Sequence, residues 1–475
     1  MGERAAGQLT RNWDGSLRPG AHVHIVGIGG IGMSAIARVL LERGGYRVSG
    51  SDRSLSEVGR ALARLGAQVY DGHRAGQIGD ADVLFVSSAI PGDNVEVQAA
   101  RARGIPVVAR PQVLAWLTAP YQTIAVAGTH GKTTTTAMIA QLLLRAGLDP
   151  TFIVGGVLPG LDTNARAGQG PHFVIEADEY DRTFLALRPS VAVITNIELD
   201  HPDCYPTFAE VQAAFRAFVA GVVPAGLVVA CSDDQGARAL LADLPQGRRA
   251  IRYGLEGPCD LSAADLCNNG SGYGFELVAA GERQGRLQLE VPGLHNVRNA
   301  LAALAVAREL GIAGAVAREV LASYQGVGRR FELKGEAHGV TVVDDYAHHP
   351  TEIRATLAAA RARFGERPIW AVFQPHTFSR TQALLEEYRQ SFREADHVLI
   401  TPIYAARERD DHSISAADLV RGVDHSDMRS VPDLEAATEV LVRGVQAGDV
   451  VVVMGAGDSY RVGEGVLTVL RGRGR

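Results

Sequence analysis

The loop at residues 128–134 constrains the fold of this chain more than any other feature of its sequence. It follows an apolar run at residues 123–127, precedes a helical pattern, and consists of Gly128, Thr129, His130, Gly131, Lys132, Thr133 and Thr134. A glycine-rich loop between a strand and a helix points its backbone N–H groups at one place, where the helix N-terminus adds partial positive charge. The pattern predicts an ATP phosphate-binding loop, with Lys132 on the β- and γ-phosphates and the Thr133 hydroxyl on Mg²⁺. Because Val126 replaces the first glycine of the GxxxxGK[ST] pattern, a glycine-rich turn with a surface lysine is the alternative.

Lysine is almost absent from the chain. Of 47 basic residues among 475, only Lys132 and Lys334 are lysines, and the others are arginines. The planar fork of arginine is a poor replacement for a compact ammonium between phosphates. A lysine in the loop therefore favours the phosphate-binding interpretation.

Short apolar runs alternate with helical patterns along the whole chain, which is typical of α/β domains with parallel sheets. Proline and small residues interrupt the alternation near residues 118–120, and a further series starts near Gly326. We therefore expect three α/β domains, at residues 1–119, 120–325 and 326–475. Strands are expected at residues 22–28, 82–87, 107–108, 123–127, 173–175, 191–194, 226–230, 340–343, 369–373, 397–400 and 450–454, a hairpin within 268–285, and helices at 31–43, 295–310, 351–364 and 380–392.

Composition excludes several classes of protein. The net charge of −6, with arginines interleaved among acidic residues, argues against nucleic acid as a main partner. Four cysteines without CxxC pairs or zinc-site spacing indicate a reduced setting. Met1–Ser16 contains no apolar stretch of signal-peptide type, and no run approaches the roughly 20 apolar residues of a membrane span. We expect a cytoplasmic protein without membrane insertion, and no pattern indicates an obligate protein partner.

Acidic clusters follow two of the predicted strands. One occupies residues 176–179, after the run 173–175, and the other lies within residues 196–201, after the run 191–195. The carboxyl ends of parallel strands meet at one sheet edge, which is also the edge of the phosphate loop. A single acidic residue at a strand end is more often simply solvated. Two clusters beside one phosphate loop favour the metal binding that phosphoryl transfer requires.

A second glycine motif lies near the N-terminus. Residues 27–32 fit GxGxxG between a strand and a helix, and Asp52 follows 20 residues after Gly32. Alone, this motif predicts an NAD-dependent oxidoreductase. The same backbone geometry also binds the diphosphate of other nucleotides, such as a UDP-sugar. An oxidoreductase, an ATP-driven ligase and a nucleotide-binding switch therefore all remain open on this motif.

The order of five motifs resembles the Mur ligase family. These motifs lie at residues 128–134, 176–181, 196–201, 295–299 and 344–350, and the resemblance extends from Gly27 to Asp458. Each motif alone is moderately specific, but the ordered set is highly specific. The family's loop reads GTxGKT, so Val126 fits it. The resemblance implies a Rossmann-like first domain, a central P-loop-type ATPase domain and a Rossmann-like C-terminal domain.

The activity that the resemblance implies is ATP-dependent ligation of L-alanine to UDP-N-acetylmuramate through an acyl phosphate, in peptidoglycan synthesis. ATP and two Mg²⁺ ions are the implied cofactors. Several family members bridge metals with a carbamoylated central-domain lysine, but no lysine lies between Lys132 and Lys334 here. This absence leaves His201 to hold the second metal.

The family's functional residues map onto matching positions. Lys132, Glu176 and His201 are implied to be catalytic, and Thr133, Glu176 and His201 to bind metal. Besides the phosphate loop, the residues implied to bind ATP are His295, Asn296, Asn299, Arg329 and Asp345. The UDP-sugar is assigned to Gly29, Gly30, Ile31, Gly32 and Asp52, and the amino acid to His348, His376 and Arg380. Simpler interpretations are a helix cap for His349, a surface charge for Arg330 and a structural histidine for His376.

Overall fold

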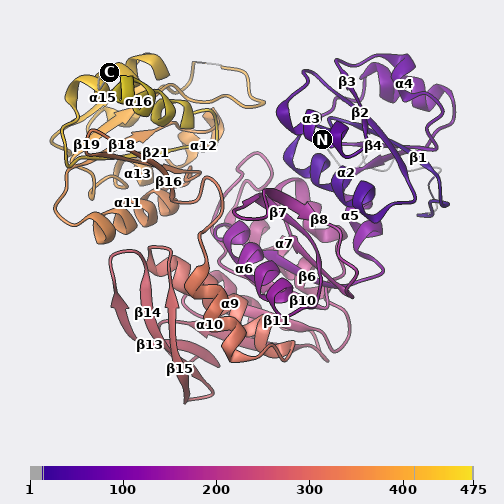
Figure 1. Cartoon of the computed structure of the whole chain (residues 1–475), viewed down its shortest axis with the longest axis horizontal. Coiled ribbons are helices and arrows are strands. Elements are labelled where there is room, and N and C mark those ends of the chain that lie inside the picture. The colour runs from indigo at the N-terminus through magenta and orange to yellow at the C-terminus, as the bar shows by residue number, and fades with distance from the viewer. Residues whose placement is uncertain (1–12, 14, 411, 473–475) are drawn as a thin grey trace.

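The computed structural model describes residues 13, 15–410 and 412–472, and it contains three separate β-sheets. Figure 1 shows them as three bodies, indigo at the N-terminus, purple through magenta to salmon in the middle and orange to yellow at the C-terminus. The expected mixed α/β fold with three domains is confirmed. The expectation that Met1–Ser16 carries no targeting segment falls mostly outside the described residues. Among the described residues, no helix is both long enough and apolar enough to cross a membrane.

The N-terminal sheet has five parallel strands in the order β3-β2-β1-β4-β5. Its elements are β1 (His22–Val26), α2 (Ile31–Arg43), β2 (Arg47–Asp52), α3 (Glu57–Arg64), β3 (Gln68–Asp71), β4 (Val83–Val86), α4 (Val95–Ala102), β5 (Val107–Ala109) and α5 (Arg110–Thr118). The strand order reverses beside β1, and the loop between β1 and α2 lies at this switch point. Ligands of doubly wound sheets bind there.

The central sheet has ten strands in the order β15-β14-β13-β12-β11-β10-β6-β9-β7-β8. Its elements are β6 (Gln122–Ala127), α6 (Lys132–Arg145), β7 (Thr151–Leu158), β8 (Thr163–Arg166), β9 (His172–Glu176), β10 (Val191–Ile194), α7 (Phe208–Ala220), β11 (Leu227–Cys231), α8 (Gln235–Ala242), β12 (Arg249–Gly254), β13 (Leu261–Asn268), β14 (Tyr273–Ala279), β15 (Glu282–Leu289), α9 (Leu294–Glu309) and α10 (Gly314–Ser323). The expected hairpin is the antiparallel pair β14–β15.

The position of β6 in this sheet determines what surrounds the phosphate loop. Strand β6 lies between β9 and β10 and is parallel to both. The two acidic clusters follow these same two neighbours, so both clusters lie at the carboxyl edge from which the loop emerges. The buried face of α6 packs against the alanine-rich face of α9. Small side chains on α9 permit this close approach of the two helices.

The C-terminal sheet has the order β16-β17-β21-β18-β19-β20, with β16 antiparallel and the other pairs parallel. Its elements are β16 (Glu332–Ala337), β17 (Val340–Asp345), α11 (Pro350–Phe364), β18 (Ile369–Phe373), α12 (Phe378–Ala383), α13 (Leu385–Arg389), β19 (His397–Ile400), α14 (Ala416–Val420), β20 (Met428–Ser430), α15 (Leu434–Gly444), β21 (Val450–Met454) and α16 (Tyr460–Gly472). The single helix expected at residues 380–392 is wrong. Two short helices replace it, because Leu384 leaves the helical conformation at φ −114° and ψ 23°.

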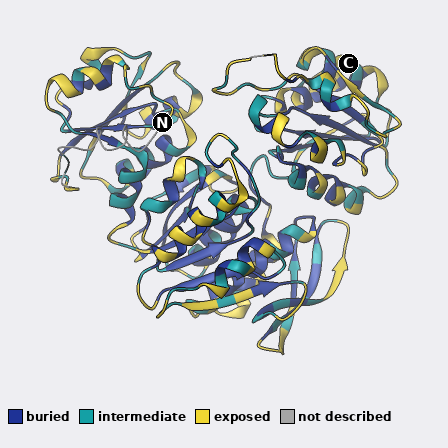
Figure 2. Ribbon diagram, turned by 180° about the vertical axis from the view of Figure 1, so that it is seen from behind, coloured by how far each residue is buried: buried dark blue, intermediate teal, exposed yellow. Residues whose placement is uncertain are grey.

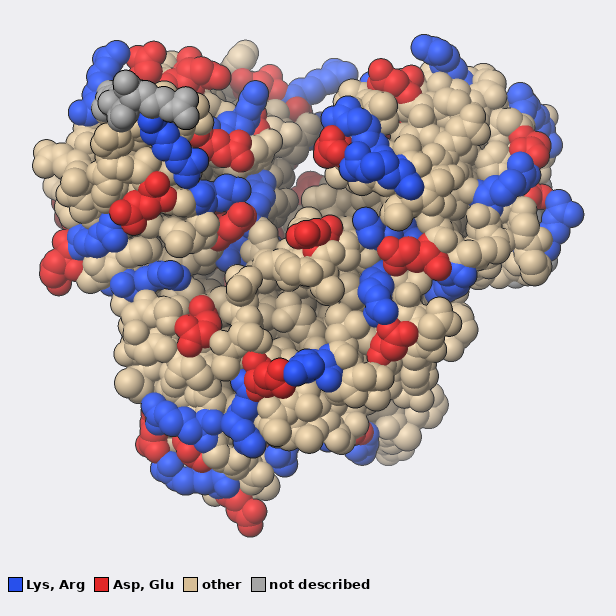
Figure 3. Space-filling view, viewed as in Figure 1, with Lys and Arg blue, Asp and Glu red and all other residues tan. Residues whose placement is uncertain are grey.

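Burial follows the sheets. Figure 2 shows the strands mostly dark blue and the outward faces of the helices yellow. Central strands such as β18 and β21 are apolar at every position and buried throughout. Parallel strands covered by helices on both faces have this composition. On the face shown in Figure 3, basic and acidic side chains are interspersed, and the surface is hollowed where the three bodies meet.

Candidate active site

The phosphate loop joins β6 to α6 and is shaped by two glycines. Gly128 has φ +140° and Gly131 has φ +80°, which other residues rarely adopt. A Cβ atom at Gly128 would lie 1.9 Å from Thr195 Oγ1, and one at Gly131 would lie 2.5 Å from Asn299 Oδ1. Both positions therefore require glycine, for space as well as for conformation.

The Lys132 ammonium lies inside the loop. Its Nζ donates to Gly128 O at 2.5 Å, to Thr129 O at 3.1 Å and to Glu179 Oε1 at 2.9 Å. Burial lowers the pKa of Lys132, but the Glu179 and Asp178 carboxylates outweigh burial and raise it above the ordinary value. The side chain is therefore charged and held inside the loop by two backbone carbonyls and the Glu179 carboxylate.

Thr133 and Glu176, two of the expected metal ligands, lie side by side. The Thr133 hydroxyl donates to Glu176 Oε2 at 3.2 Å, and the backbone N–H of Gly155 donates to Glu176 Oε1. Burial raises the pKa of Glu176, and Gly155 and Lys132 oppose this effect. A hydroxyl and a carboxylate at this spacing are ligands that suit Mg²⁺.

His201, the other expected metal ligand, lies in a separate group with Glu179 and Asp200. One ligand atom from each of these three residues lies within 4.8 Å of the others. His201 Nε2 is 3.7 Å from Glu179 Oε1 and 3.5 Å from Asp200 Oδ2. The backbone of His201 has φ +55°, a strained conformation that is found at functional sites. Glu179 contacts both Lys132 and His201, although no motif or spacing in the sequence distinguishes it from Glu176.

The expected amino-acid residues of the C-terminal domain reach this group. Arg380 Nε donates to Asp200 Oδ1 at 2.7 Å, Nη2 lies 3.2 Å from His201 Nδ1, and Nη1 lies 3.0 Å from His376 Nδ1. The rings of His348 and His376 are 5.8 Å apart. Burial lowers the pKa of His348 to about 3 and that of His376 to about 4, so both imidazoles are neutral at neutral pH.

A cavity of about 300 Å³ opens beside the phosphate loop. Its walls include His295, Asn296, Asn299 and Asp345, four of the five residues expected at the nucleotide outside the loop. Asn299 Nδ2 donates to Asn296 Oδ1 at 3.1 Å, which fixes both amides. Burial raises the pKa of Asp345 to about 6.

Arg329 and Arg330 are placed differently from what was expected. Arg329 donates to Asp344 Oδ2 at 3.1 Å and to the backbone carbonyls of Gly455 and Gly457 at 2.7 and 3.1 Å. It therefore ties together the C-terminal domain. Arg330, rather than Arg329, lines the cavity beside the phosphate loop, where its partly exposed guanidinium lies 3.7 Å from Glu352 Oε1. The sequence offered no signal to separate these adjacent arginines.

The first-domain glycine loop lies at the boundary with the central domain. Gly30 caps α2, and Gly29 N donates to Asp52 Oδ2 at 2.8 Å, so Asp52 holds the loop. A cavity of about 200 Å³ is lined by residues of both domains, among them Ile31, Gly32, Arg110, Gly155, Glu176 and Asp178. The glycine loop and the expected metal ligand Glu176 therefore share one cavity. Arg110, which packs against Gly32, was not anticipated from the sequence.

Comparison with known proteins assigns all three parts of the chain to one family. Residues 22–122 match the model described as Mur ligase family, catalytic domain, residues 126–307 match the Mur ligase middle domain, and residues 329–457 match the Mur ligase, glutamate ligase domain. The N-terminal glycine motif thus lies within a ligase domain, and the oxidoreductase interpretation is wrong.

Similar proteins match over nearly their whole length. A UDP-N-acetylmuramate–L-alanine ligase of Roseiflexus sp. (strain RS-1) is 46% identical over 469 residues, which cover 95% of this chain and 99% of the relative. A protein of the same name from Geobacter sp. (strain M21) is 46% identical, with 94% and 97% covered. The crystal structure of a UDP-N-acetylmuramate–alanine ligase from Thermotoga maritima matches with a TM-score of 0.80 and 29% identity, covering 95% of this chain and 99% of that one. This chain belongs to the Mur ligase family.

Proposed function

We propose that this chain uses ATP to join L-alanine to UDP-N-acetylmuramate, the first peptide-adding step of peptidoglycan synthesis. One observation carries the proposal: the phosphate loop, the first-domain glycine loop and the C-terminal histidines and arginine all meet the acidic edge beside β6. Relatives that are 46% identical over nearly the whole chain are named for this reaction.

The chemistry begins with a poor electrophile, because the negative charge of a carboxylate repels an amine. Transfer of the γ-phosphoryl group of ATP to the lactyl carboxylate gives an acyl phosphate with a good leaving group. The alanine amine then attacks the carbonyl carbon, and phosphate leaves from the tetrahedral intermediate. Lys132 and the N–H groups of the phosphate loop stabilise the charge that develops on the phosphate oxygens.

Mg²⁺ is the metal that these ligands fit. We assign one ion to Thr133 and Glu176 and a second to His201, beside Glu179 and Asp200. The donors are mostly oxygen, and the three ligand atoms of the second group lie within 4.8 Å of one another. When bound, the ions would neutralise charge on the transferred phosphoryl group.

The C-terminal domain supplies the amino-acid end. The neutral imidazoles of His348 and His376 can lie beside the alanine amine without adding positive charge there, and the Arg380 guanidinium suits its carboxylate. Burial of these groups between domains excludes water from the acyl phosphate. We place the reaction in the cytoplasm, and the four free cysteines, all within the described residues, fit a reduced compartment.

The proposed function is tested by phosphate release with ATP, UDP-N-acetylmuramate and a panel of L-alanine, glycine and L-serine. We expect release to require all three substrates and L-alanine to give the highest kcat/KM. A rise in thermal midpoint with UDP and with ATP, but not with NADH, is the expected binding control. Phosphate release that is independent of the amino acid, or stabilisation by NADH but not UDP, would refute the proposal.

Replacing His201 with alanine tests the second metal. Loss of one ligand is expected to raise the Mg²⁺ concentration for half-maximal activity by on the order of tenfold or more, with the fold intact. His412→Ala is the matched control, because that side chain is 87% exposed on the C-terminal domain. Mg²⁺ titrations of ligase activity at saturating substrates make the comparison. An unchanged metal titration in His201→Ala would exclude His201 as a ligand.

A further inference from the structure

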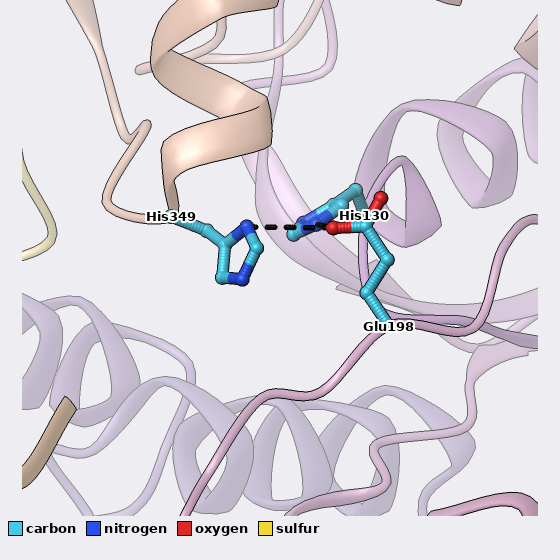
Figure 4. Close-up of side chains that lie close together, drawn as sticks. All are labelled: His130, Glu198 and His349. Atoms are coloured by element: carbon cyan, nitrogen blue, oxygen red, sulfur yellow. Dashed lines mark hydrogen bonds and ion pairs between the residues drawn. The ribbon is translucent and has the colours of Figure 1, made fainter. Parts of the chain in front are cut away.

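A second cluster of histidines and carboxylates lies beside the phosphate loop, outside the group around His201. His130 is the third residue of the loop, and its Nε2 lies 3.4 Å from Glu198 Oε2. Its Nδ1 lies 3.2 Å from Glu352 Oε1. Figure 4 shows His130 and Glu198 side by side in the central domain, with His349 reaching toward them from the start of α11. The imidazole is thus held between two carboxylates from different domains.

The backbone of His130 is also fixed. Its N–H donates to Asn196 Oδ1 at 2.8 Å, and its carbonyl accepts from Thr195 Oγ1 at 2.6 Å and from Asn196 Nδ2 at 3.1 Å. These hydrogen bonds restrict rotation of the His130 backbone, so a movement of the side chain also affects the neighbouring loop residues. A side chain fixed at both ring nitrogens, on a backbone fixed at both polar groups, makes this point of the loop rigid.

Electrostatic interactions keep the bridge formed by Glu198, His130 and Glu352 charged. Burial alone would lower the pKa of His130, but hydrogen bonds and charges from Glu198 and Glu352 raise it to about 9. Contact with His130 overcomes burial to lower the pKa of Glu198 to about 2. The charges of His348 and then His130 lower the pKa of Glu352 well below its usual range. At neutral pH the cluster is an imidazolium between two carboxylates.

Glu352 links this bridge to the first turn of α11. Its Oε2 accepts the backbone N–H groups of His348 at 2.9 Å and His349 at 3.2 Å, which forms a capping box with the His349 N-cap. The expected cap role of His349 is thereby confirmed. Thr351 Oγ1, one residue before Glu352, donates to Glu198 Oε2 at 2.7 Å. The docked helix end therefore contacts the central domain at two adjacent positions.

A metal is a weaker explanation of the same cluster. Ligand atoms of His130, Glu198 and His349 do lie within 4.8 Å of one another. However, His349 Nδ1, the ring nitrogen nearest Glu198, already accepts the Thr351 N–H at 3.3 Å. The two ring nitrogens of His130 moreover face different carboxylates, Nε2 that of Glu198 at 3.4 Å and Nδ1 that of Glu352 at 3.2 Å, as in an ion-pair bridge.

We propose that Glu352 is a positioning residue for the phosphate loop, which it holds through the His130 side chain when the first turn of α11 is docked on the central domain. The helix cap, the interdomain contact and the phosphate loop then form one unit. ATP binding depends on this unit because the backbone of the loop contributes the N–H groups for phosphate. The inference rests on the proposed role of the loop in ATP binding.

A double-mutant cycle on ATP affinity tests the coupling. Calorimetry gives the Kd for Mg·ATP of the full-length wild type, His130→Gln, Glu352→Gln and the double variant. Glutamine at 352 keeps an oxygen for the cap and removes the charge. Each single variant is expected to weaken ATP binding by roughly tenfold or more, as loss of a charged hydrogen bond does. The double variant should bind ATP about as weakly as the weaker single variant.

The matched control separates capping from positioning. Asp418→Asn weakens the capping box that Asp418 forms with Ser415 in α14 of the same domain. Its effect on ATP affinity should be small and should add to that of His130→Gln. Unchanged ATP affinity in Glu352→Gln, or independent effects of His130→Gln and Glu352→Gln, would overturn the proposal. Because binding is measured, this outcome is distinct from failure of the complete ligation reaction in the wild type.

Discussion

Replacing Lys132 with alanine is expected to lower ligase turnover by a factor on the order of 10³, the scale at which enzymes lose a group that stabilises charge in the transition state. No other lysine lies in the central domain, and the nearest in the sequence is Lys334. The substitution also leaves Glu179 buried without its ammonium partner. Phosphate release at saturating substrates measures the loss.

The chain offers a matched lysine control. Lys334 Nζ lies 3.2 Å from Glu332 in a partly exposed pair on β16, so Lys334→Ala should change turnover little. Lys132→Arg should not restore activity, since a planar guanidinium does not fit the space of a compact ammonium inside the loop. Near-normal ligation by Lys132→Ala would show that the loop does not bind the transferred phosphate.

Replacing Arg380 with glutamine is expected to reduce both stability and activity. Arg380 and Asp200 are almost fully buried, and their pair spans the central and C-terminal domains. Removing one partner of a buried pair costs about 3–5 kcal/mol, because the other charge remains unpaired. The substitution also removes the guanidinium assigned to the alanine carboxylate. We expect a lower thermal midpoint together with a loss of kcat/KM for L-alanine of about a hundredfold.

Arg443→Gln provides the comparison for Arg380. Arg443 forms an i,i+4 pair with Glu439 on α15, and both side chains are mostly exposed. Such a pair contributes about 0.3–0.5 kcal/mol, so both thermal midpoint and kcat/KM should stay close to wild type. If Arg380→Gln matched Arg443→Gln in both measurements, Arg380 would belong neither to the interdomain contact nor to the amino-acid site.

The fold was most predictable where burial is complete. The apolar runs at β18 and β21 gave strand bounds that coincide with those observed, since every side chain there is buried. The edge strands β3, β16 and β20 escaped prediction. Their sequences are polar, because an edge strand faces solvent and lacks the continuous apolar pattern of a central strand. The break between α12 and α13 could not be predicted either, because no proline or glycine lies there.

The functional residues of the candidate site could be predicted where they belong to a short sequence motif. The phosphate loop follows β6, and the two acidic clusters follow the strands on either side of it, β9 and β10. Glu352 could not be found in this way. In the sequence it occupies the third position of a capped helix, and a local role explains it fully. Its contact with His130 depends on how two domains dock, which no spacing along the chain reveals.

The Arg380–Asp200 pair joins residues 180 positions apart, whereas Lys132 and Glu179 are separated by 47. The phosphate loop and its carboxylate can thus form as soon as the central domain folds during synthesis, but Arg380 arrives much later. Until then, Asp200 has no guanidinium beside it. A partly made chain without the C-terminal domain therefore lacks both the guanidinium that pairs with Asp200 and the residues assigned to L-alanine. The ion pair between Asp200 and Arg380 therefore exists only when the central and C-terminal domains are both present and docked.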